Sequence, residues 1–210
     1  MKKLDIRSLV FLAILAAWGI VLRQFDFPIL PAAPFLKVDL SDLTALIALI
    51  VHGPVGLVIV ALIRDSLNYV LKGGEVGIPI GAIMSFVATV AMFLPAHIAL
   101  KYMKQGHKWF KYAFMSIGLI LLLTVSMALI NYYVALPLYI KVLNFPIDNI
   151  LAYVMTLIVP FNLIKGLILA GLQIITFRTV MPFIQKRDLL FGDYQGHIQK
   201  RSAKKLAVQP

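Results

Sequence analysis

The segment Val159-Pro160-Phe161-Asn162-Leu163-Ile164-Lys165-Gly166 decides the fold class of this chain, because it places a lysine inside a long apolar run. The run extends from about residue 150 to 183 and is otherwise nearly free of charge. A lysine at bilayer depth costs at least ~2.5–3.5 kcal/mol on insertion scales, so it normally faces a cavity or a partner. Pro160 removes a backbone hydrogen bond and can bend the helix towards such a cavity. Asn162 and Lys165 share one helical face, so the segment predicts the wall of a polar pocket inside a membrane protein.

The composition agrees with a membrane protein. Of the 210 residues, 61% are hydrophobic and 14% are charged, and the mean hydropathy is +0.92. The chain has no cysteine, which excludes disulfides and thiolate metal sites. A formal charge of +11 could suggest nucleic-acid binding. The basic residues, however, lie between hydrophobic segments and in a C-terminal tail, so we expect a lipid bilayer and no nucleic acid as partner.

Apolar runs of the length that crosses ~30 Å of hydrocarbon recur along the chain, and they predict an all-α integral membrane protein. We expect a six-helix substrate-binding membrane domain at residues 1–182, followed by a basic cytoplasmic tail at residues 183–210. No small-residue cleavage site precedes Arg23, so the first apolar run is expected to stay as a span. The six transmembrane helices are expected at about residues 8–23, 40–51, 54–71, 79–102, 113–136 and 150–183.

The distribution of cations predicts the orientation. If the N-terminus is cytoplasmic, the segments outside hold only Arg23, Lys37, Lys72 and Lys141, and most other cations fall inside. This asymmetry favours an N-in, C-in arrangement. Polar residues of spans three, five and six then lie at a similar depth near the outer side: Arg64, Asn68, Asn131, Asn162 and Lys165.

Two connections lie above these polar residues. Residues 24–41 carry three prolines among aromatic residues, and they form either a lid or a packed surface loop. Residues 72–77 hold three glycines and Glu75, and either approach a ligand closely or form an ordinary turn. We therefore expect an outward-facing ligand pocket under the loops that join spans one to two and three to four.

Several of these residues have a structural interpretation as well. Ala13 and Ala17 form a small-xxx-small pattern, which suits close packing either within the molecule or against a partner helix. Lys165 could pair with Asp65 or with a backbone carbonyl, and Arg64 could pair with a carboxylate without touching a ligand. Asn68 and Asn162 could be hydrogen-bonding contacts between helices. The four histidines are scattered, so no metal site is expected.

Four stretches together resemble the riboflavin-specific S components (the RibU family) of energy-coupling factor (ECF) vitamin transporters. They are Pro34-Phe35-Leu36-Lys37-Val38-Asp39-Leu40-Ser41-Asp42, His52-Gly53-Pro54, Gly74-Glu75-Val76-Gly77 and the segment quoted first. With the six-span layout, the resemblance covers roughly residues 8–182.

The resemblance implies a subunit of the prokaryotic plasma membrane that binds riboflavin from outside as its transported ligand. It implies docking through Ala13 and Ala17 onto a module of one transmembrane coupling protein and two ATPases. Asn131 and Lys165 would bind the polar edge of the flavin ring. Leu36, Lys37 and the Gly74–Gly77 region would enclose the ligand, and Glu75 suits the ribityl hydroxyls.

Energy must come from a partner, because the chain has no G-x-x-x-x-G-K-[ST] phosphate loop. No internal repeat is evident, so a subunit is favoured over a complete secondary carrier. One alternative is a sibling of this class that binds flavin mononucleotide, with Arg64 or Lys72 at the phosphate, or another vitamin. The alternative from another class is an integral-membrane enzyme that acts on a lipid. Such sites usually gather several acidic groups, whereas only Asp65 is expected to be buried in a span, so we predict no enzyme and no cofactor.

Overall fold

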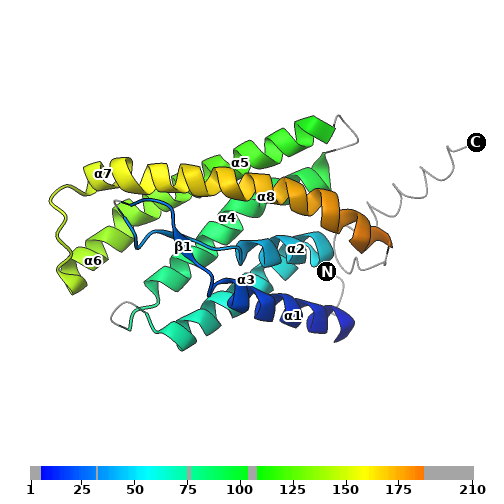
Figure 1. Cartoon of the computed structure of the whole chain (residues 1–210), viewed down its shortest axis with the longest axis horizontal. Coiled ribbons are helices and arrows are strands. Elements are labelled where there is room, and N and C mark those ends of the chain that lie inside the picture. The colour runs from blue at the N-terminus through cyan, green and yellow to red at the C-terminus, as the bar shows by residue number, and fades with distance from the viewer. Residues whose placement is uncertain (1–5, 32, 75–76, 104–107, 187–210) are drawn as a thin grey trace, which may run out of the picture.

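The computed structural model describes residues 6–31, 33–74, 77–103 and 108–186, and almost all of them are helical. The elements in chain order are α1 (Ile6–Leu22), β1 (Phe27–Pro28), β2 (Lys37–Val38), α2 (Asp42–His52), α3 (Pro54–Lys72), α4 (Ile80–Tyr102), α5 (Lys108–Ile130), the π-helix η1 (Asn131–Ala135), α6 (Leu136–Leu143), α7 (Ile150–Tyr153), the π-helix η2 (Val154–Ile158) and α8 (Val159–Lys186). Figure 1 shows α5 and α8 side by side, with α1, α2 and α3 beneath them.

The centre of the bundle is the short helix α2, which is buried on almost all sides. Nine of its 11 residues are buried, and it packs against α1, α3, α4 and α8. A helix that is apolar all round is stable only when neighbours cover every face. Gly53 ends α2 with φ of +83°, a value that favours glycine, and Pro54 then begins α3. The predicted His52-Gly53-Pro54 turn is therefore confirmed.

The connection between α1 and α2, which we call the first loop (residues 23–41), is partly ordered by a two-stranded ribbon. Phe27 pairs with Val38, and Pro28 pairs with Lys37. Val38 and Ala33 are fully buried, so the loop is anchored to the bundle. The all-helical prediction missed this ribbon, because two-residue strands leave no periodic signal in the sequence.

Each of the two long helical segments near the C-terminus contains a π-helix that ends two residues before a proline. The N–H of Leu136 bonds the carbonyl of Asn131, and that of Val159 bonds the carbonyl of Val154, so both bonds span five residues. Pro137 and Pro160 cannot donate to the carbonyl four residues earlier, which favours this wider pairing. The two π-helices contact each other. The helix also continues to Leu143, beyond the predicted end of span five near residue 136.

Four helical segments in the described part of the chain are long and apolar enough to cross a membrane: Pro54–Lys72, Ile80–Tyr102, Lys108–Leu143 and Ile150–Ile184. The helices Ile6–Leu22 and Asp42–His52 are apolar but shorter. The β ribbon, the end of α3 and the α6–α7 connection lie towards one end of the molecule, and the start of α1 and the end of α8 lie towards the other (Figure 1). On α8, the Arg178 guanidinium lies 5.4 Å from the ring centroid of Trp109.

Candidate functional site

A buried polar cluster holds five helices together around Arg64, whose side chain is fully buried. Its Nε and Nη2 donate to the two carboxylate oxygens of Asp65 at 3.0 and 3.1 Å. Its Nη1 donates to Asp42 Oδ1 at 2.8 Å, and Nη2 donates to Thr89 Oγ1 at 2.9 Å. The guanidinium thus binds carboxylates of α2 and α3 and a hydroxyl of α4, which satisfies a charge that could not otherwise be buried.

Two further cations complete this cluster. Arg23, which directly follows α1, pairs with Asp65 and donates to Ser85 Oγ at 2.9 Å. Lys165 Nζ on α8 lies 3.6 Å from Asp42 Oδ2. We call this set the ion network: the cations Arg23, Arg64 and Lys165, the carboxylates Asp42 and Asp65, and the hydroxyls of Ser85 and Thr89. Three cations face two carboxylates, so the network carries one positive charge in excess.

Helix α1 approaches this network closely at Gly19. A Cβ atom at Gly19 would lie 2.8 Å from Thr44 Oγ1 and 3.2 Å from Arg64 Cδ, which is too close for an unshifted structure. Glycine at this position therefore lets α1 pack directly over the buried guanidinium. The opposite face of α1 carries Ala13 and Ala17, which are both exposed. This contradicts the interpretation that the two alanines pack within the molecule.

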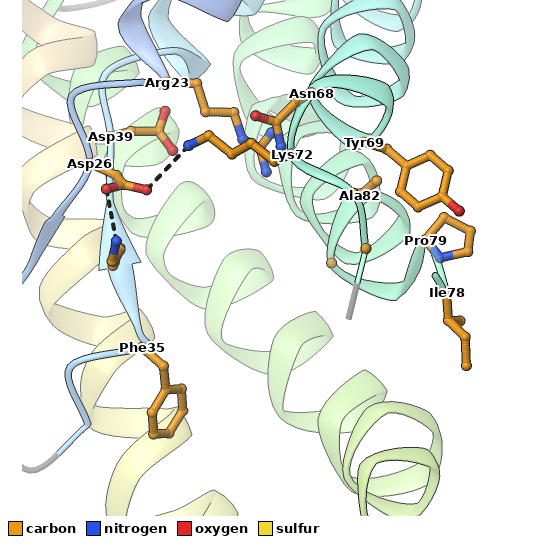
Figure 2. A pocket seen from close by; sticks show the side chains of 14 residues that line it. Arg23, Asp26, Phe35, Asp39, Asn68, Tyr69, Lys72, Ile78, Pro79 and Ala82 are labelled. Atoms are coloured by element: carbon orange, nitrogen blue, oxygen red, sulfur yellow. Dashed lines mark hydrogen bonds and ion pairs between the residues drawn. The ribbon is translucent and has the colours of Figure 1, made fainter. Parts of the chain in front are cut away.

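Next to the network lies a cavity of about 450 Å³, within the range of ~300–1,000 Å³ typical of ligand sites. We call it the pocket. It is lined by Arg23, Asp26, Phe35, Lys37, Asp39, Asn68, Tyr69, Lys72, Gly73, Gly74, Ile78, Pro79, Gly81 and Ala82. Figure 2 shows its side chains gathered from the first loop, the end of α3 and the start of α4.

Charged groups close one side of the pocket. Asp26 lies between two lysines, with Oδ1 at 3.0 Å from Lys37 Nζ and Oδ2 at 3.8 Å from Lys72 Nζ (Figure 2). This arrangement links the first loop to the end of α3. Tyr69 Oη donates to the carbonyl of Gly77 at 2.6 Å, which ties α3 to the connection before α4. Because both lysines are about half exposed, these pairs add little to stability and can open readily.

Asn68 is the polar group in the pocket wall that most clearly lacks a protein partner. Its Oδ1 is buried and accepts no hydrogen bond from the described residues. A buried acceptor left unpaired costs about 1–3 kcal/mol, so it is a natural place for a hydroxyl or N–H of a ligand.

The structure divides the predicted site residues into two groups. Lys37, Asn68 and Gly74 line the pocket, whereas Glu75 lies outside the described residues. Asn131, Asn162 and Lys165 do not line it. Asn131 and Asn162 are buried and donate from Nδ2 to the carbonyls of Met127 and Ile158, each at 2.8 Å. These hydrogen bonds are thus within the same helical segments rather than between helices.

A second apolar cluster lies beside the first loop. It is built on Leu136, Val154 and Ile158, and Leu36 of the first loop packs against it. The ring of Phe35 lines the pocket and also meets Phe145 edge-on, with 6.2 Å between ring centroids. The first loop therefore contacts both the polar pocket and an apolar cluster whose buried residues belong to α6 and η2.

The sequence analysis did not identify Asp42 as a partner of Arg64 and Lys165. Asp42, the first residue of α2, is buried and accepts a hydrogen bond from Arg64. Lys165 pairs with Asp42 and not with Asp65. An acidic residue that opens a largely apolar helix, with an arginine inside the next apolar run, was the signal that could have revealed the pairing of Asp42 with Arg64.

Taken together, these features describe a multi-pass membrane protein with a ligand-sized polar pocket beside a buried ion network. The sequence pattern of the family described as "ECF transporter, substrate-specific component" matches residues 7–177. The chain therefore belongs to the substrate-specific components of ECF transporters.

Individual relatives support this assignment. The riboflavin transporter RibU of Streptococcus thermophilus is 40% identical over 166 residues, or 77% of each chain. The riboflavin transporter FmnP of Bacillus subtilis is 28% identical, over 88% of this chain and 97% of that protein. A solved S component of a bacterial ECF transporter is similar with a TM-score of 0.67 and 30% identity, over 85% of this chain and 97% of that one.

Proposed function

We propose that this chain is the riboflavin-binding subunit of an ECF-type transporter. It captures riboflavin outside the cell and releases it inward when docked on a module of one transmembrane coupling protein and two ATPases. The observation that carries the proposal is the pocket of about 450 Å³ with Asn68 in its wall, whose side-chain carbonyl has no partner among the described residues. The pocket occurs in a chain that is 40% identical to a riboflavin transporter.

The pocket suits the ribityl end of riboflavin. Ribityl hydroxyls both donate and accept, so they match the Asn68 carbonyl as acceptor and the Lys37 ammonium as donor. Gly74 lines the same space, and Glu75 and Gly77 belong to the same connection. The proposal assigns these residues, with Leu36 above them, to the ribityl chain and its cover.

The flavin ring edge is assigned to Asn131, Asn162 and Lys165. An amide offers a donor and an acceptor, and lysine offers three donors, which suits the alternating polar atoms of that edge. Since these residues do not line the pocket, ring insertion requires the first loop to shift. Separating Leu36 from the second apolar cluster would open an apolar slot for the ring, and the ring would then replace the lost contacts.

We propose six membrane-crossing helices with both termini in the prokaryotic cytoplasm and the pocket facing outward. At about 1.5 Å per residue, the 11 residues of α2 cover roughly 16 Å. Because α2 is buried, its length need not match the bilayer. The substrate-binding domain is assigned to residues 1–182, and residues 183–210 are assigned to a basic cytoplasmic tail.

We assign docking to the exposed face of α1. Ala13 and Ala17 lie there among large apolar side chains that include Val10, Ile14 and Trp18. Two small residues one turn apart let a partner helix approach closely, and the flanking side chains supply apolar area. We propose that the protein is not an enzyme, because the two buried carboxylates of the described residues are paired with Arg23, Arg64 and Lys165, and its relatives are transporters.

One observation favours flavin mononucleotide as a second candidate ligand. Arg23, Lys37 and Lys72 line the pocket together with two carboxylates, so a phosphate could displace Asp26 from the two lysines. Arg64 is fully buried and occupied by carboxylates, so of the two candidate phosphate ligands only Lys72 is accessible. Lys72→Ala should weaken flavin mononucleotide binding and leave riboflavin binding nearly unchanged.

The test is the absorbance spectrum of the protein purified alone in detergent, followed by titration with riboflavin and fluorescence quenching. A co-purifying flavin band, or tight 1:1 quenching that Lys165→Ala and Asn131→Ala weaken, is the expected result. Lys141→Ala removes an exposed lysine of α6 and is the matched control. A well-folded sample with neither a flavin band nor quenching would rule out riboflavin as the ligand.

A further inference from the structure

Asp42 stands out among the buried groups because its two carboxylate oxygens have different partners. Oδ1 accepts from Arg64 Nη1 and from Thr89 Oγ1, both at 2.8 Å. Oδ2 faces Lys165 Nζ at 3.6 Å, which is within ion-pair range but too long for a hydrogen bond. The first oxygen therefore fixes the carboxylate in place, and the second orients a cation of another helix.

We infer that Asp42 is a positioning residue for Lys165, and that the ion network leaves this lysine free to donate to a ligand with an electronegative edge. Asp42 already accepts a hydrogen bond from Arg64, and it attracts Lys165 only as an ion pair without a hydrogen bond to its ammonium group. The three ammonium protons of Lys165 remain available to an acceptor outside the network. The part of the inference that concerns a ligand rests on the proposed riboflavin function.

The distribution of charge in the network supports this assignment. Arg64 is completely buried, whereas the Arg23 and Lys165 side chains are 16% and 15% exposed. The excess positive charge thus reaches accessible space only at Arg23 and Lys165. Arg23 lines the pocket, and Lys165 lies on the other side of Asp42. An acceptor-rich ligand edge relieves the buried charge excess, whereas an apolar or cationic ligand does not.

A structural explanation makes a different prediction. If Asp42 only neutralises Arg64, replacing Asp42 affects the fold, and the resulting change in the riboflavin Kd is the same with and without Lys165. If Asp42 positions Lys165, replacing Asp42 has no effect on the riboflavin Kd in a variant that already lacks the Lys165 ammonium. A double-mutant cycle on the riboflavin Kd separates these two cases.

In the cycle, Asp42→Asn should weaken riboflavin binding by about 10-fold in the wild-type background, as expected for misplacing one charged hydrogen bond. In the Lys165→Met background the same change should alter the Kd by less than about twofold. Asp26→Asn is the matched control, because this carboxylate pairs with Lys37 and Lys72 instead, and its effect should be the same in both backgrounds. Equal losses from Asp42→Asn in both backgrounds overturn the inference.

A second measurement needs no ligand, so it remains decisive if riboflavin does not bind. Lysine acylation of the full-length protein in detergent is followed residue by residue by mass spectrometry. Asp42→Asn should raise the rate at Lys165 several-fold, because the side chain loses its anchor, and should leave Lys141 unchanged. Thermal unfolding of the same sample confirms that it is folded. An unchanged rate at Lys165 in a folded variant refutes the positioning role.

Discussion

Replacing Arg64 with methionine removes the centre of the ion network and leaves two carboxylates without their shared cation. Breaking a buried ion pair by deleting one partner typically costs about 3–5 kcal/mol. Here each carboxylate keeps one other cation, since Asp65 still pairs with Arg23 and Asp42 still faces Lys165. The expected loss in the free energy of unfolding is therefore at the low end of the range, about 3 kcal/mol.

The assay is equilibrium unfolding of the purified protein in mixed micelles with increasing denaturing detergent, followed by circular dichroism without ligand. Arg178→Met is the matched control, because Arg178 is exposed and its ring contact with Trp109 contributes only about 1 kcal/mol. A loss for Arg64→Met no larger than that of the control would refute the reasoning. It would mean that the network carries no net stabilising energy.

Three other changes have defined outcomes. Ala17→Trp should abolish uptake by cells carrying the whole transporter, while the purified variant still binds riboflavin. The control Val125→Trp, on the exposed face of α5, should preserve both uptake and binding. If Ala17→Trp also loses riboflavin binding, Ala17 has a folding role instead. Asn68→Ala should weaken riboflavin binding by about 10-fold in the fluorescence titration, because a buried acceptor is removed, and unchanged affinity would remove Asn68 from the site. Gly19→Ala should destabilise the protein by about 1–3 kcal/mol, because its Cβ meets Thr44 and Arg64. The control Gly171→Ala meets nothing within 4 Å and should change the unfolding free energy by less than about 0.5 kcal/mol, so equal effects of the two changes would contradict the close packing of α1.

The helices were predictable from the sequence because each is encoded locally. Apolar runs, Pro54 at the start of α3 and Gly53 at the end of α2 each act within a few residues, and the boundary between α2 and α3 followed from them. The π-helices were not predicted. Their cause, a proline two residues downstream, was seen at Pro160 but interpreted as a bend rather than as a change in hydrogen-bond pairing.

The site was only partly predictable, because its organisation depends on contacts far apart in the chain. Asn68 and Lys165 were found because a polar group inside an apolar run is conspicuous. The pairing of Lys165 with Asp42 joins residues 123 positions apart, and no local pattern encodes it. Helical faces were also extrapolated as if the helices were regular. The extra residue in η1 and in η2 shifts the faces on either side by about 100°.

The exposed face of α1 carries a natural optical label. The chain has two tryptophans, and the structure places Trp18 on that face and Trp109 on α5 beside Arg178. Trp109→Phe would leave Trp18 as the sole indole, one residue from Ala17. Indole emission responds to the polarity of its surroundings, so exchanging lipid for a protein partner should shift its wavelength. Assembly of the transporter could then be followed in real time without attaching a dye to the helix that is proposed to dock.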